Sequence, residues 1–75
     1  MKTIYVLLDS IEKAKNFVED VSCVKGNATI RYGKNFIDAK SIMGVFTLDL
    51  SKKLRLEIDD WKEEYIVLFE RYLVL

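Results

Sequence analysis

Apolar positions along this chain follow two different periods, which divide it into short elements. Residues 2–8 form a β-branched and aromatic run that predicts a strand. The segment after it repeats apolar residues at offsets of three and four, which predicts an amphipathic helix of about three turns. The apolar stripe of this helix contains Ile11, Ala14, Phe17, Val18 and Val21.

A capping signal precedes that helix. Asp9 or Ser10 offers a side-chain oxygen to the first free backbone N–H groups. Glu12 follows Asp9 at the three-residue spacing of a capping box. The helix is therefore expected to begin directly after these residues.

The middle of the chain predicts a hairpin and a second helix. Residues 28–32 form a strand with Ala28 and Ile30 on one face, and residues 33–35 (Gly-Lys-Asn) form the turn. Residues 36–38 are the short returning strand. Ser41 opens a shorter helix that runs to about residue 48.

The last third predicts a strand and a helix. Residues 54–58 alternate apolar and charged side chains, which is typical of a half-exposed strand. Asp60 and Glu63 have capping-box spacing, which predicts the start of a final helix running to the C-terminus. Its stripe consists of Trp61, Tyr65, Leu68, Phe69, Tyr72 and Leu75, and we expect Trp61, Tyr65 and Phe69 in the core.

The element order is therefore βαββαβα. Short connections, hairpin-paired strands and helices on one face predict an α+β two-layer sandwich. Repeats, linkers and low-complexity tracts are absent from the sequence, so residues 1–75 are expected to form a single domain.

Composition narrows the classes of partner. Twelve basic residues balance twelve acidic ones, so we expect no nucleic acid and no membrane as partner. The sequence has no apolar run of about 20 residues. With a single cysteine, it is expected to be soluble and cytoplasmic.

The chain has few residues suited to catalysis. It contains no histidine, so we expect no metal and no cofactor. Cys23 has no second thiol, and we expect it to be a small buried or half-buried residue. The acidic residues around Asp60 are expected to be the dipole-matched start of the last helix.

One segment carries a family resemblance. Residues 38–48 read Asp-Ala-Lys-Ser-Ile-Met-Gly-Val-Phe-Thr-Leu, and residues 16–18 (Asn-Phe-Val) add a weaker match. These segments resemble the histidine-containing phosphocarrier (HPr) family of the bacterial sugar phosphotransferase system. The resemblance implies an open-faced sandwich with a four-stranded antiparallel sheet and three helices on one face.

The position that defines the family's chemistry is degenerate here. Aligning on Phe17 and Val18 puts Ser10 where the family carries its phosphoryl-accepting histidine, and Glu12 where it carries an arginine. Serine lacks the nucleophilicity of imidazole, and a carboxylate repels phosphate. We therefore expect histidine-based phosphotransfer to be lost and the chain not to be an enzyme. In this respect it resembles the catabolite-repression HPr homologue, which also lacks the active histidine but keeps the regulatory serine. Ser10 and Asp9 are better explained as helix caps.

Ser41 matches the family's regulatory serine. The resemblance implies phosphorylation by an HPr kinase/phosphorylase, with Lys40 helping to neutralise the phosphate. Ile42, Met43 and Phe46 flank the serine. The resemblance implies that the positions of Ile42 and Met43 dock onto protein partners such as a repressor-type regulator, and we expect Phe46 and Lys40 beside them to contribute to partner binding. The alternatives are that Ser41 only caps its helix and that its apolar neighbours pack against the sheet, as we expect of Val45 and Leu48.

Three functions follow from these observations. The first is a non-catalytic, HPr-like regulatory protein that is phosphorylated on Ser41 and acts as a co-effector in carbon regulation. The second is a structural interaction domain, or a homodimer, without phosphorylation. The third is a phosphotransfer carrier that uses another residue, for which we expect no labelling by phosphoenolpyruvate and enzyme I.

Overall fold

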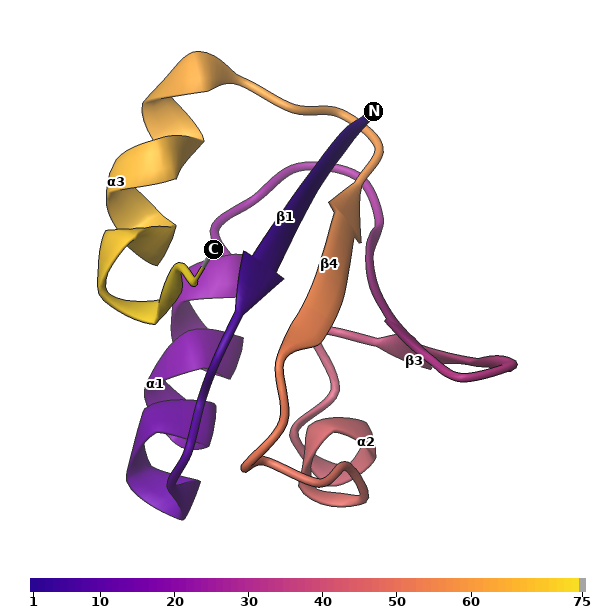
Figure 1. Ribbon diagram of the computed structural model, residues 1–75. Coiled ribbons are helices and arrows are strands. Elements are labelled where there is room, and N and C mark those ends of the chain that lie inside the picture. The colour runs from indigo at the N-terminus through magenta and orange to yellow at the C-terminus, as the bar shows by residue number, and fades with distance from the viewer. Residues whose placement is uncertain (75) are drawn as a thin grey trace.

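The computed structural model describes residues 1–74, which form four strands and three helices in the predicted order (Figure 1). The strands are β1 (Lys2–Val6), β2 (Ala28–Tyr32), β3 (Asn35–Asp38) and β4 (Leu54–Ile58). The helices are α1 (Ile11–Val21), α2 (Ile42–Phe46) and α3 (Ile66–Phe69). Two 3₁₀ turns, η1 (Glu63–Tyr65) and η2 (Glu70–Tyr72), flank α3. The architecture is an α+β open-faced sandwich, as predicted.

All strand pairs in the sheet are antiparallel, in the order β1-β4-β2-β3. Ile4 of β1 lies opposite Leu56, which lies opposite Ile30 of β2, and all three are buried. Because side chains alternate along a strand, the neighbouring positions of each strand face the opposite side. The helices cover only the first of these two faces, and α1 and α3 lie on the same side of β1 and β4 (Figure 1).

Aromatic rings join α1 to α3. Phe17 of α1 lies 6.1 Å from Phe69 of α3 and 5.4 Å from Tyr72, measured between ring centroids. The Phe17–Tyr72 pair is edge-to-face, which is the favoured geometry for such pairs. All three residues are buried. The predicted core positions Phe69 and Tyr65 are confirmed, whereas Trp61 is only half-buried.

The final helix differs from its prediction. Lys62 is extended, so the helical segment begins at Glu63 and not at the predicted Asp60–Glu63 capping box. After Tyr72 the chain is extended again, and Val74 N–H donates to the Tyr5 carbonyl at 3.0 Å. Hydrogen bonds to the outer edge of β1 therefore replace helical ones, a tertiary effect that outweighs helix propensity. The predicted stripe position Leu75 lies outside the described residues.

Two details of α1 also differ from the sequence prediction. Ser10 caps the helix, with its Oγ accepting from Lys13 N–H at 3.1 Å, but Asp9 and Glu12 do not form the predicted capping box. Asp9 has a positive φ of 50° and instead lies 3.8 Å from the Lys13 ammonium. Ile11, predicted on the apolar stripe, is 66% exposed, whereas the other stripe positions, Ala14, Phe17, Val18 and Val21, are buried. The first turn of α1 lies beyond the end of β1 (Figure 1).

Candidate functional site

The predicted regulatory position lies at the start of α2. Ser41 is half-buried, and its Oγ accepts from Gly44 N–H at 3.2 Å. A Cβ at Gly44 would lie 2.9 Å from Cγ2 of Ile37, so glycine allows this helix to approach β3 closely. The cap is thus in place and its hydroxyl is not sealed in the core.

The residues flanking Ser41 divide between surface and core. Ile42, Met43 and Phe46 are exposed, and Met43 is 74% exposed. We call these three residues the α2 patch. Val45 and Leu48 are buried against the sheet, as predicted. This five-residue helix leaves the apolar surface of three side chains exposed to solvent. An exposed apolar patch of this kind is typical of a surface that contacts another molecule.

Lys40 has a local structural role. Its ammonium donates to the carbonyls of Val24 at 2.6 Å and Gly26 at 2.9 Å, on the connection between α1 and β2. Its backbone N–H donates to Oδ1 of Asp38 at 2.9 Å. The ammonium that was predicted to neutralise a phosphoryl group on Ser41 therefore already binds two backbone carbonyls.

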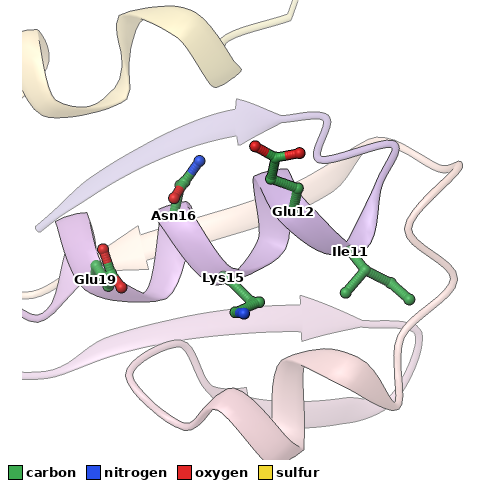
Figure 2. Close-up of a pocket in the computed structure, with 5 residues that line it drawn as sticks. All are labelled: Ile11, Glu12, Lys15, Asn16 and Glu19. Carbon is green, nitrogen blue, oxygen red and sulfur yellow. The ribbon is translucent and has the colours of Figure 1, made fainter.

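Ser10 and Glu12, which occupy the degenerate active-site positions, lie at the start of α1. Among residues 1–74, no hydrogen bond or ion pair joins either of them to Ser41. Glu12 lies on a shallow hollow of ≈ 540 Å³ along α1, with Ile11, Lys15, Asn16 and Glu19. In Figure 2, Glu12 and Asn16 extend toward α3 and Lys15 toward α2, so their polar groups diverge. The hollow therefore has no convergent set of catalytic groups.

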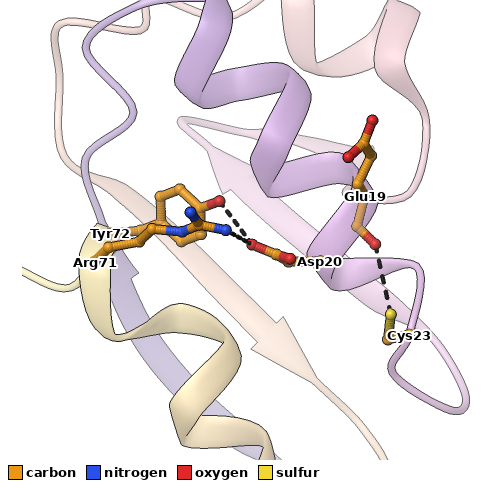
Figure 3. A network of polar contacts seen from close by, with 5 residues as sticks. All are labelled: Glu19, Asp20, Cys23, Arg71 and Tyr72. Carbon is orange, nitrogen blue, oxygen red and sulfur yellow. Dashed lines mark hydrogen bonds and ion pairs between the residues drawn. The ribbon is translucent and has the colours of Figure 1, made fainter.

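Cys23 contradicts its prediction. It is exposed, not buried or half-buried, because it follows the last turn of α1, where the connection to β2 runs along the surface. Its thiol makes a long, 3.7 Å contact with the Glu19 carbonyl (Figure 3). Across residues 1–74, no cluster of three or more His, Cys, Asp or Glu side chains could hold a metal ion.

A cluster of polar side chains connects the C-terminal turn of α1 to η2. Arg71 Nη2 and the Tyr72 hydroxyl both donate to Oδ2 of Asp20, at 2.8 and 2.7 Å (Figure 3). Burial of Tyr72 and its hydrogen bond to Asp20 raise its pKa to about 12. The same carboxylate raises the pKa of Arg71. Because both side chains donate to the same carboxylate oxygen, we interpret this arrangement as structural.

The residues that lie together on the uncovered face of the sheet were not identified from the sequence. This face brings together Tyr5, Arg55, Arg31 and Phe36, one from each strand. The alternation of residues 54–58 signals an exposed face, but only the strand register shows which side chains become neighbours. Register depends on long-range pairing, which a single sequence does not display.

Comparison of the chain with protein-family models, with curated proteins and with solved structures finds no match. The resemblance to the HPr family therefore stays a prediction based on residues 38–48. Within residues 1–74, no helix has the length and apolar character needed to cross a membrane.

Proposed function

We propose that this chain is a non-catalytic, HPr-like regulatory and binding protein that is phosphorylated on Ser41 and acts as a co-effector in carbon regulation. A chain without histidine has no imidazole on which to carry a phosphoryl group. In this proposal the partners are an HPr kinase/phosphorylase and a repressor-type regulator, both suggested by the resemblance of residues 38–48.

The observation that carries the proposal is the position of Ser41 beside the α2 patch. The serine hydroxyl and three exposed apolar side chains belong to one short segment. A phosphoryl group on Ser41 would add about −1.5 to −2 charges next to that patch. A partner that contacts the patch would therefore bind the two forms of the protein with different affinity.

The first test is phosphorylation with an HPr kinase/phosphorylase and ATP, with an authentic HPr as positive control. Mass spectrometry should find one added phosphate on the wild-type chain and none on Ser41→Ala. Ser10→Ala is the matched control, because it removes the same kind of cap from α1 and should leave labelling intact. No labelling of the wild type beside a labelled HPr would refute the proposal.

The second candidate is a homodimer or structural interaction domain without phosphorylation. It is favoured by β3, which forms one edge of the sheet with β2 as its strand partner. Exposed edges are common sites of strand addition. Sedimentation should then find a dimer whose stability is unchanged by Ser41→Ala, whereas a strictly monomeric chain at high concentration would exclude it.

A further inference from the structure

The uncovered face of the sheet carries one continuous row of side chains. Tyr5 of β1 lies opposite Arg55 of β4, Arg55 lies opposite Arg31 of β2, and Arg31 lies opposite Phe36 of β3. We call these four residues the open-face row. With strands about 4.8 Å apart, the row spans about 14 Å. Its order is aromatic, cation, cation, aromatic.

The two arginines are held side by side by one carboxylate. Arg31 Nε and Arg55 Nε lie 2.9 and 3.0 Å from the same Oε2 of Glu57. Like charges directly opposite one another destabilise a sheet, and one carboxylate neutralises only one of the two. Glu57 binds both Nε atoms, and across residues 1–74 neither guanidinium has another hydrogen-bond or ion-pair partner. The Nη groups therefore remain available to an anion.

The ends of the row present aromatic rings to solvent. Phe36 is 62% exposed and Tyr5 is 40% exposed. The Arg31 guanidinium carbon lies 4.5 Å from the centroid of the Phe36 ring, and the Lys53 ammonium lies 5.0 Å from that of Tyr5. Each ring thus has a cation beside it, a combination on which planar groups stack.

We infer that the open-face row binds single-stranded nucleic acid, about two or three nucleotides, with bases stacked on Phe36 and Tyr5 and phosphate held by Arg31 and Arg55. Guanidinium groups bind phosphate in a bidentate manner through paired N–H donors. This surface is opposite the helical layer, so the inference does not depend on Ser41 or on the α2 patch.

The zero net charge predicted no such partner, but it averages over every surface of the molecule. Many of the acidic side chains lie on other elements, such as Glu12 and Glu19 on α1. Near the open-face row, the charges of Arg31 and Arg55 are matched in number by those of Glu57 and Asp38. Stacking is therefore expected to contribute more to binding than charge.

Two other occupants fit the row less well. An acidic peptide would use the arginines but would leave the exposed rings without a role. A second copy packed symmetrically on the same face would bring its own two arginines against these two, which is unfavourable. Nucleic acid is the partner whose chemistry matches both the cations and the rings.

The test is fluorescence anisotropy with labelled rU10 and dT10 added to the full-length, unphosphorylated chain. We expect a dissociation constant on the order of 10–100 µM at low salt. Phe36→Ala should weaken binding about tenfold or more through lost stacking. The logarithm of the binding constant should fall against that of salt with a slope of about −1.4, and Arg55→Gln should reduce it to about −0.7.

Matched controls are Lys15→Gln, which removes an exposed cation from α1, and Ser41→Ala, which changes the proposed regulatory site. Both should retain wild-type affinity, and circular dichroism should show that all variants are folded. Unchanged affinity in Phe36→Ala would overturn the inference, as would an equal loss in Lys15→Gln. Displacement by polyglutamate with equal effect on wild type and Phe36→Ala would indicate an acidic protein instead, and a dimer disrupted by Arg55→Gln would indicate a second copy.

Discussion

Tyr72 donates its phenolic hydrogen bond to Oδ2 of Asp20 at 2.7 Å, across 52 positions of sequence (Figure 3). The contact joins the last helical turn of the chain to the C-terminal turn of α1. Arg71 donates to the same oxygen at 2.8 Å, so the carboxylate binds two groups from one turn. This relationship leads to a prediction about pH.

The stability of the protein should decrease between pH 10 and pH 12. Burial and the hydrogen bond to Asp20 raise the pKa of Tyr72 from 10.0 to about 12. The folded chain therefore keeps a proton that the unfolded chain releases, so the contribution is complete below pH 10 and is lost as pH rises to 12. We expect a loss of about 1–2 kcal/mol, after allowing for solvent screening of this pair.

Urea denaturation at several pH values measures this effect. Tyr72→Phe is the matched variant, since it removes the hydroxyl and keeps the buried ring. The free energy of unfolding of this variant should be about 1 kcal/mol lower than that of the wild type at pH 8, and it should decrease less steeply above pH 10. An identical decline in wild type and Tyr72→Phe would show that other groups cause it.

Two glycines should differ in their tolerance of alanine. Gly26 has φ 74°, and a Cβ there would collide with Oδ1 of Asp59, which accepts the Asn27 N–H at 2.8 Å. Gly33 has φ 61° but has no atom within 4 Å of such a Cβ. Gly33→Ala should cost only the left-handed backbone penalty of about 1–2 kcal/mol.

Gly26→Ala should cost about 1–2 kcal/mol more, because the collision also displaces a hydrogen-bond acceptor. Urea unfolding of both variants gives the difference directly. Equal losses would mean that the connection between α1 and β2 can move away from Asp59 without cost.

Phe17 and Ile11 belong to the same sequence stripe and should behave in opposite ways. Phe17→Ala removes a fully buried ring that packs on Phe69 and Tyr72, and should cost about 3–5 kcal/mol. That is a large part of the total stability expected for a domain of this size. Ile11→Ala should change stability by less than about 0.5 kcal/mol.

Thermal or urea unfolding followed by circular dichroism distinguishes the two residues. Should Phe17→Ala be unfolded in buffer, Phe17→Leu provides a milder substitution at the same site. A large loss in Ile11→Ala would mean that its side chain is covered in solution.

Lys40 should be important for stability and dispensable for phosphorylation. Lys40→Met removes the hydrogen bonds to the Val24 and Gly26 carbonyls and should cost about 1–2 kcal/mol. Labelling of Ser41 should persist, because its hydroxyl contacts Gly44 and not Lys40. Lys15→Met, on an exposed face of α1, is the control and should be near neutral.

Urea unfolding and a kinase assay on the same preparations check both statements. Unchanged stability together with lost labelling would instead make Lys40 a contact residue for the kinase, in line with its prediction as a partner-binding residue.

The local pattern of apolar and polar residues was sufficient to predict most of the helices and strands. The strands at 28–32 and 54–58 and the helix at 11–21 occur where the periodicity predicted them. Ser10 and Ser41 cap their helices because a cap is satisfied by backbone N–H groups only three residues away. Such contacts involve neighbouring residues, so a single sequence can indicate them, although it did not decide between Asp9 and Ser10.

The final helix could not be predicted in the same way. Its apolar stripe is compatible with a continuous helix, yet the chain becomes extended after Tyr72 because Leu73 and Val74 pair with β1. The exposure of Ile11 likewise depends on where the first turn of α1 lies relative to the sheet. Both outcomes depend on residues far away in the sequence.

The sequence alone therefore determined the order of the elements, the Ser41 cap and the absence of histidine, since each follows from nearby residues or from composition. Only the tertiary structure decided that Arg31 and Arg55 share Glu57, that Tyr72 reaches Asp20, and that the Lys40 ammonium binds two backbone carbonyls. These relationships join segments 14 to 52 positions apart, or adjacent strands whose register is set by the whole core.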